Sequence, residues 1–174
     1  MNYCGIGSRN CPNEFLDYFT LAGSFLAIEG LILRSGGADG CDLAFEDGCS
    51  AVGGKKEIYL PWNGFNGSKS NLVVKDQRAF DIAKKYHPYW YNLKDGAKKL
   101  QARNSHQVLG WDLKSPTDFI LCWTKNGEMV GGTSQALRIA EDYNIPIFNF
   151  GKYKTVEDSQ KPFKEFLEMF IKIN

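Results

Sequence analysis

The chain has 174 residues, which suits one domain of ordinary size that buries a hydrophobic core without disulfide or metal support. Its 21 basic and 20 acidic residues leave a net charge of +1, which excludes a protein that binds nucleic acid through a large overall positive charge. Hydrophobic residues make up 43% and charged residues 24%, as is typical of globular proteins. We expect residues 1–174 to form a single domain.

The five cysteines are odd in number and have no C-x-x-C spacing, which favours a reducing compartment over a disulfide scaffold. No segment has the pattern of a signal peptide or the length of a membrane span, so we expect a cytoplasmic protein without a membrane partner. His87 and His106 lie far apart, with no cysteine or carboxylate at a zinc-binding spacing. We therefore expect no metal site, and no cofactor is indicated.

The first half of the chain predicts three strands separated by two helices. An extended run over 2–7 is followed by a helix over 12–29, with Pro12 in its first turn and Gly30 as its stop. The next elements, in chain order, are a buried strand over 31–33, a helix over 42–52 and a strand over 57–61.

The second half continues the alternation of helices and strands. In order, it predicts a polar loop over 63–71, a helix over 75–86, an irregular aromatic stretch over 87–92, a helix over 95–109, a strand over 117–124, a helix over 134–143, a strand over 145–149 and a helix over 156–171. Strands that alternate with helices predict an α/β fold, an open and mostly parallel sheet with helices on both faces.

Glycine-rich segments fall at three of the predicted junctions between a strand and a helix. They are Gly5-Ile6-Gly7-Ser8-Arg9, Ser35-Gly36-Gly37-Ala38-Asp39-Gly40 and Gly131-Gly132-Thr133. Such junctions meet at the carboxyl edge of a parallel sheet, where backbone N–H groups at helix starts bind phosphate. Hydroxyls and a guanidinium add donors, so we predict that a nucleotide or nucleotide-derived phosphate binds to Gly7, Ser8, Arg9, Ser35, Gly36, Gly37, Ala38, Asp39, Gly40, Asp42, Gly131, Gly132, Thr133 and Ser134.

Each of these features has a simpler interpretation. A pair of glycines is more often a tight turn, and Asp42 suits the first turn of a helix whether or not it meets a ligand. Asp39 and Asp42 are also placed to bond ribose hydroxyls, as acidic residues do in other dinucleotide folds. Arg103 and Asn104, like the lysine clusters at 55–56 and 94–99, fit either a solvated surface or a basic groove.

The three glycine segments, with the Ser-Gly-Gly-Ala-x-Gly-x-Asp run of 35–42 and the Ala-x-x-x-x-Ile-Pro run of 140–146, resemble the SLOG superfamily of Rossmann-like proteins. This superfamily includes DNA-processing protein A (Smf/DprA) and the Lonely-Guy proteins. The resemblance covers residues 2–150 and is strongest to short stand-alone relatives of DNA-processing protein A. It implies a Rossmann-like fold with a nucleotide or phosphate pocket formed by the three loops.

The Lonely-Guy branch implies an alternative function, a nucleoside 5'-monophosphate N-glycosidase that uses an arginine and a glutamate. Arg103 matches the arginine, but Ser134-Gln135-Ala136 follows Gly132-Thr133 where that branch has its glutamate. A hydrolase would need another carboxylate, and the sequence offers Asp42, Glu46, Asp118 and Glu128. The catalytic residues of this alternative are Arg103 with Asp42 and Glu46.

The branch of DNA-processing protein A implies a second alternative, a mediator of recombination that binds single-stranded DNA. Six aromatic residues are candidates for stacking on bases, although core packing or a dimer interface is the favoured explanation: Trp62, Phe65, Tyr89, Trp90, Tyr91 and Trp111. Family members often form dimers. We therefore expect a homo-oligomer such as a dimer, with 86–91 as the candidate interface.

Overall fold

The structure is a computed structural model that describes residues 1–173. Its centre is a six-stranded sheet in the order β4-β3-β2-β1-β5-β6, with every pair of neighbours parallel. The strands are β1 (Asn2–Gly7), β2 (Ile32–Ser35), β3 (Lys56–Leu60), β4 (Leu72–Val73), β5 (Phe119–Trp123) and β6 (Ile147–Asn149). The fold class predicted from the sequence is confirmed.

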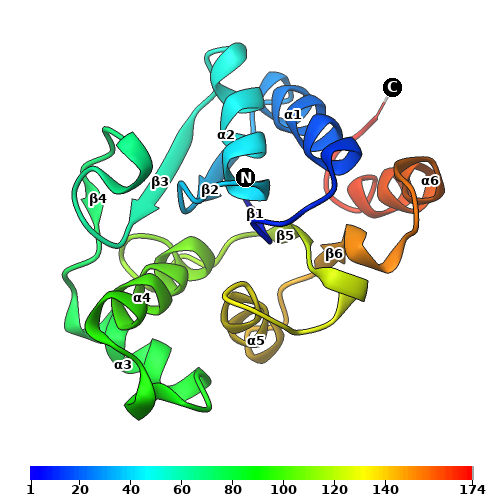
Figure 1. Ribbon diagram of the computed structural model, residues 1–174. Helices are drawn as coiled ribbons and strands as arrows, with labels where there is room; N and C mark the ends of the chain where they lie inside the picture. The colour runs from blue at the N-terminus through cyan, green and yellow to red at the C-terminus, as the bar shows by residue number, and fades with distance from the viewer. Residues whose placement is uncertain (174) are drawn as a thin grey trace.

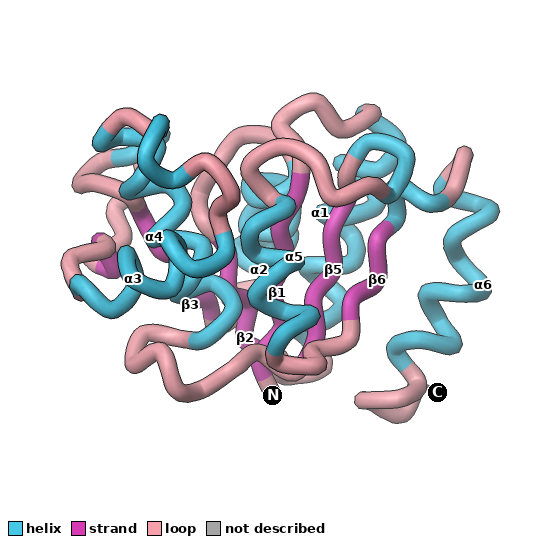
Figure 2. Tube along the Cα trace, turned by 90° about the horizontal axis from the view of Figure 1, so that it is seen from below, coloured by secondary structure: helices cyan, strands magenta, loops and turns pink. Residues whose placement is uncertain are grey.

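Helices cover both faces of the sheet (Figures 1 and 2). They are α1 (Asn13–Ile28), α2 (Cys41–Ala51), α3 (Gln77–Tyr86), α4 (Asp95–Leu109), α5 (Ser134–Asp142) and α6 (Val156–Leu167). In Figure 1, α1, α2 and α6 lie on one side of the sheet and α3, α4 and α5 on the other. This arrangement is the one expected of a parallel sheet whose crossovers are helices.

Each face of the sheet carries its own hydrophobic core, because successive strand residues point to opposite faces. Tyr3 packs with Phe15, Phe19 and Phe45 under α1 and α2. Its neighbour Cys4 faces the other core, which is built from small residues and aliphatic side chains of α3, α4 and α5. Most of the buried aromatic residues thus gather on the side of α1 and α2, while Trp90 belongs to the other core. The α4 side keeps room for the polar groups described below.

Two details differ from the sequence prediction. The stretch after β3 was expected to be a polar loop, but it contains a 3-10 turn at Phe65–Gly67 and leads into β4, a two-residue edge strand. Phe65 is buried there, so one aromatic residue organises an otherwise polar segment. The last helix ends at Leu167 rather than near residue 171.

None of the described helices combines the length and the apolar character that crossing a membrane requires.

Candidate functional site

The direction in which strands are added to the sheet reverses between β1 and β5. The chain builds outward from β1 through β2 and β3 to β4, and then returns to place β5 on the other side of β1. The loops after two such adjacent strands diverge, which leaves a crevice at their carboxyl ends where ligands bind in open α/β sheets. A cleft of about 340 Å³ lies at this point, lined by loops after β1, β2 and β5, by α4 and by the start of α5.

Nine residues that the sequence singled out line this cleft together: Gly7, Ser8, Arg9, Ala38, Asp42, Arg103, Gly131, Gly132 and Thr133. They come from four segments that are far apart in the chain. Residues from all three predicted glycine segments are therefore brought to one cleft.

Other predicted residues lie outside the lining of the cleft. Ser35 is fully buried, and its hydroxyl donates to the carbonyl of Gly5 (2.7 Å). Gly37, Asp39 and Glu46 line a separate pocket of about 260 Å³. The remaining residues of this group are Gly36, Gly40 and Ser134.

The further carboxylates proposed for catalysis lie elsewhere as well. Asp118 accepts a hydrogen bond from the backbone N–H of Asn2 (2.6 Å), at the opposite, amino ends of the strands. Glu128 is exposed and does not line the cleft, and Glu46 pairs with Lys56 (2.8 Å). Asp42 is thus the one carboxylate among the described residues that line the cleft.

Asp42 is buried in the first turn of α2 and is bonded from several sides. It accepts hydrogen bonds from the backbone N–H groups of Gly7 (3.2 Å) and Gly36 (3.1 Å) and from Nε2 of Gln107 (3.4 Å). Burial raises the pKa of Asp42, while the charge of Arg103 and the backbone N–H groups act in the opposite direction. Asp42 therefore links the ends of β1 and β2 to α2 and α4.

Arg103 crosses from α4 toward the loop after β2. Its Nη1 donates to the carbonyl of Gly36 and lies 3.8 Å from Oδ2 of Asp42. Burial lowers the pKa of Arg103, and the negative charge of Asp42 counteracts this. Glycine at residue 36 allows this approach, because a β-carbon there would clash with Nη1 of Arg103 unless that side chain moved.

Gly40 allows another close approach, between the loops that follow β1 and β2. Its φ is +80°, a conformation that favours glycine, and a β-carbon there would lie 2.6 Å from the carbonyl oxygen of Ser8. The close approach of the two loops is thus allowed by a residue that does not itself line the cleft.

The start of α5 presents unpaired donors. Among the residues that the structure describes, the backbone N–H groups of Gly132 and Thr133 have no hydrogen-bond acceptor. The Ser134 hydroxyl instead donates to the carbonyl of Gly131 (2.7 Å). Unpaired N–H groups at a helix start, together with the positive end of the helix dipole, favour an anion.

Two exposed cations complete the rim of the cleft. Arg9 follows β1 and Lys125 follows β5, and both line the cleft. Neither forms an ion pair with any residue in the described part of the chain. The guanidinium of Arg9 and the ammonium of Lys125 are thus available to a phosphate.

Sequence reasoning missed Lys125 and two of the three amide side chains that α4 contributes, Gln101 and Gln107. Asn104 was noted only as the neighbour of Arg103. The available signal was periodic, since residues three apart share one side of a helix and these three positions are polar. Lys125 had no comparable signal, because it lies in a short turn after a strand.

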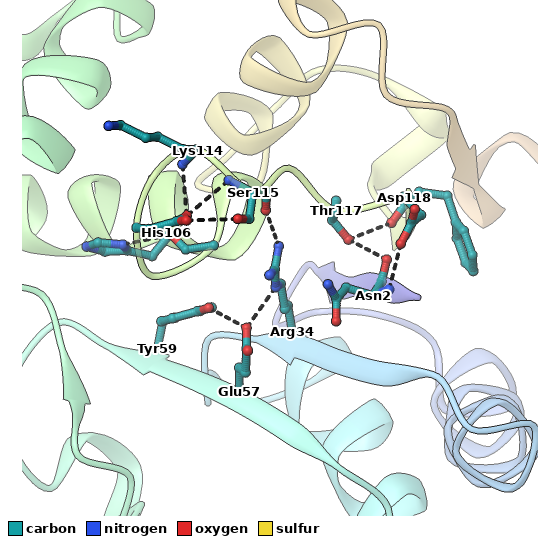
Figure 3. A network of polar contacts seen from close by, with 12 residues as sticks. Asn2, Arg34, Glu57, Tyr59, His106, Lys114, Ser115, Thr117 and Asp118 are labelled. Atoms are coloured by element: carbon teal, nitrogen blue, oxygen red, sulfur yellow. Dashed lines mark hydrogen bonds and ion pairs between the residues drawn. The ribbon is translucent and has the colours of Figure 1, made fainter.

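A second polar network fixes the far end of α4 (Figure 3). Arg34 on β2 is buried, and its Nε donates to Glu57 (2.8 Å) while its Nη1 donates to the carbonyl of Ser115 (2.6 Å). The hydroxyl of Tyr59 also donates to Glu57 (2.6 Å). The turn after α4 is thereby held to β2 and β3, which sets the position of the helix that carries Arg103.

The aromatic stretch at 86–91 divides between core and surface. Trp90 is buried against the core on the α4 side, while Tyr89 and Tyr91 are 69% and 79% exposed. Nζ of Lys84 lies 5.1 Å from the centroid of the Tyr91 ring, a cation–π arrangement. Trp62, at 40%, and Trp111, at 48%, also retain exposed surface.

The described residues contain no group of three or more His, Cys, Asp or Glu side chains that is arranged to hold a metal ion. All five cysteines are buried free thiols.

Comparison with known proteins identifies a likeness of fold. No family model matches the sequence, and no curated protein matches it. Among solved structures, DNA processing protein A from Helicobacter pylori, which binds single-stranded DNA, superimposes with a TM-score of 0.59 and 19% sequence identity. The match covers 97% of this chain and 72% of that one. The present chain therefore shares the fold of that protein.

Proposed function

We propose that the cleft binds the phosphate of a nucleotide or nucleotide-derived ligand. The observation that carries the proposal is that the open N–H groups of Gly132 and Thr133 share one cleft with Arg9 and Lys125. A helix start and two unpaired cations together favour a dianionic group. The volume of about 340 Å³ lies at the lower end of the range for small-ligand pockets.

The same geometry favours binding over cleavage of a glycosidic bond. A hydrolase of this kind needs a carboxylate free to activate water or to stabilise an oxocarbenium-like centre. Asp42 lines the cleft, but its oxygens accept hydrogen bonds from Gly7, Gly36 and Gln107. The N-glycosidase alternative would have to release Asp42 from these partners.

Isothermal titration calorimetry with nucleoside mono-, di- and cyclic nucleotides tests the proposal. We expect Arg9→Ala and Lys125→Ala each to weaken binding about tenfold, since a charge-assisted hydrogen bond contributes about 1.5–3 kcal/mol. Gly132→Asp places a carboxylate at the start of α5 and should abolish binding. Lys99→Ala, on an exposed position outside the cleft, is the matched control.

Absence of binding by the wild type, or equal binding by wild type and Gly132→Asp, would overturn the proposal. Release of free base from a bound nucleotide would instead support the N-glycosidase alternative.

A second candidate is favoured by the fold comparison. The structural neighbour binds single-stranded DNA, and we infer that this chain is a SLOG-type relative of DNA-processing protein A whose cleft receives a phosphate of a DNA strand. Exposed Tyr89 and Tyr91 would then offer stacking surfaces beside the lysines of α3.

A mobility-shift assay on an oligonucleotide separates the two candidates. Binding that falls steeply between 50 and 200 mM salt, taken as about the range in which phosphate contacts are lost, would indicate a strand. A flat salt response with intact mononucleotide binding would indicate the small ligand.

A further inference from the structure

Three amide side chains form a row along the side of α4 that faces the cleft. Gln101, Asn104 and Gln107 follow one another at intervals of three residues, and all of them line the cleft. Residues three apart lie on one side of a helix, so the row runs along a single wall. Its charge is neutral, in contrast to the cationic rim formed by Arg9 and Lys125.

The hydrogen bonds of the row fix which way two of its amides point. Nδ2 of Asn104 donates to the carbonyl of Gly132 (3.0 Å), and a carbonyl oxygen accepts only from the nitrogen end of an amide. The same nitrogen donates to Oε1 of Gln101 (3.3 Å). The orientation of Gln101 therefore follows from that of Asn104, and both follow from the backbone of residue 132.

One donor and one acceptor remain free. Nε2 of Gln101 and Oδ1 of Asn104 have no hydrogen-bond partner among the residues that the structure describes. Within those residues, the fully buried side-chain atoms that lack a partner are Tyr3 Oη, His106 Nε2 and Gln135 Oε1. The two free amide atoms of α4 are not among them, so they retain access to solvent.

We propose that Gln101 and Asn104 recognise the base of the bound nucleotide, with Nε2 of Gln101 donating to a ring acceptor and Oδ1 of Asn104 accepting from an adjacent base donor. A single asparagine or glutamine amide pairs with N7 and the N6 amino group of adenine through one donor and one acceptor. In this cleft the donor and the acceptor come from two side chains that are hydrogen-bonded to each other. Because Asn104 is bonded to Gly132, the base-binding wall is coupled to the phosphate-binding start of α5. This inference rests on the proposed function, and it assigns the base of the ligand to α4.

The base could belong to a free nucleotide or to a nucleotide within a single strand, and both present the same edge. AMP and a short oligodeoxyadenylate are therefore compared as probes. Ribose 5-phosphate serves as the probe that keeps the phosphate but lacks a base. Purine riboside 5'-monophosphate keeps N7 but lacks the amino group.

Titration calorimetry on the full chain then measures the increment in affinity that the base adds. We expect AMP to bind about tenfold more tightly than ribose 5-phosphate, because a bidentate contact with a base discriminates by about 5- to 150-fold. Purine riboside 5'-monophosphate should lose most of the increment. Gln101→Met, at a partly exposed position, removes the donor with little change of shape and should reduce the increment to about threefold or less.

Lys99→Gln, on the same helix but outside the cleft, is the control and should leave the increment unchanged. If Gln101→Met weakens AMP alone, the base belongs to a free nucleotide, and if it weakens the oligonucleotide, the base belongs to a strand. Either loss supports the proposal.

Equal affinity of the wild type for AMP and ribose 5-phosphate would overturn the proposal that Gln101 and Asn104 bind the base. The proposed phosphate site would be unaffected by that result. An increment that Gln101→Met leaves intact would overturn the same proposal. Failure of all four probes to bind would instead overturn the proposed function, and this inference with it.

Discussion

The carboxylate of Asp42 accepts a hydrogen bond from the backbone N–H of Gly7, the last residue of β1 (3.2 Å). Its other oxygen accepts from the N–H of Gly36, just after β2 (3.1 Å). Two donors that the sequence assigned to a ligand thus have an acceptor inside the protein. Within the described part of the chain, the backbone N–H groups of Gly132 and Thr133 have no such acceptor, so the proposed phosphate site centres on the start of α5.

Replacing Asp42 should strongly destabilise the protein. In Asp42→Ala, the N–H groups of Gly7 and Gly36 lose their acceptor, and Arg103 stays buried without its counter-charge. Removing one partner of a buried ion pair costs about 3–5 kcal/mol. Urea denaturation measures the loss, with Asp39→Ala, an exposed change in the loop just before α2, as the control expected within about 0.5 kcal/mol of the wild type. Equal stability of both variants would contradict the role assigned to Asp42.

Adding a single methyl group at residue 36 should displace Arg103. In Gly36→Ala the new β-carbon would meet Nη1 of Arg103 and Nε2 of Gln107, and overpacking of this kind costs about 1–3 kcal/mol. Gly96→Ala is the matched control, since its β-carbon would have only Trp62 within 4 Å, at 3.9 Å. Thermal unfolding should show a lower Tm for the first variant and an unchanged or higher Tm for the second. A Gly36→Ala variant as stable as the wild type would show that Arg103 can move without cost.

Acidification should weaken the fold through His106. This residue is buried, its ring packs against the rings of Tyr59 and Trp111, and its Nδ1 bonds the carbonyl of Gly110 (3.1 Å). Nε2 has no hydrogen-bond partner within residues 1–173, so a proton added there would have no acceptor among them. Burial accordingly lowers the pKa of His106 below its ordinary value of 6.5.

The lowered pKa of His106 makes the folded chain less stable at acidic pH, because the unfolded chain binds the proton more readily. Below pH 6.5 the unfolded chain protonates His106 before the folded chain does, so the stabilising contribution is complete above that pH and is lost as the pH falls toward the lowered pKa. We expect the free energy of unfolding to drop by about 1.4 kcal/mol for each unit by which the two pKa values of His106 differ. Urea denaturation at pH 7.5 and 5.5, taken as about one unit either side of the ordinary histidine pKa, measures the drop. His106→Phe should flatten it more than His87→Gln does, because His87 is only partly buried.

The predicted homo-oligomer would form through the exposed aromatic rings that follow α3. Tyr89 and Tyr91 expose large apolar surfaces, while Trp90 beside them is part of the core. Tyr91→Glu should therefore break a dimer formed through this face without unfolding the chain. A change at Trp90 would not separate loss of the dimer from loss of stability, because Trp90 is part of the core. Light scattering should give a dimer mass for the wild type and a monomer mass for Tyr91→Glu. An unchanged mass would remove this face as the interface.

The sequence alone specified the order and type of the main elements, because strand and helix patterns are local. Apolar runs such as Phe119–Trp123 and the helical spacing of Phe15 and Phe19 are visible without tertiary contacts. The two-residue edge strand at Leu72–Val73 was missed, since a pair of apolar residues has no period, and so was the 3-10 turn at Phe65–Gly67 before it. The order of the elements also placed the glycine segments at junctions between a strand and a helix. These junctions indicated the edge of the sheet at which a ligand would bind.

The tertiary structure decided which groups at that edge are still open to a ligand. Whether the N–H of Gly7 faces the cleft or Asp42 depends on a partner 35 residues away, which no local pattern encodes. The same holds for Asn104, whose amide is oriented by the carbonyl of Gly132 across the cleft. Hydrogen bonds between distant segments are set by packing of the whole chain, and so the residues of a site can be foreseen from sequence while the availability of their polar atoms cannot.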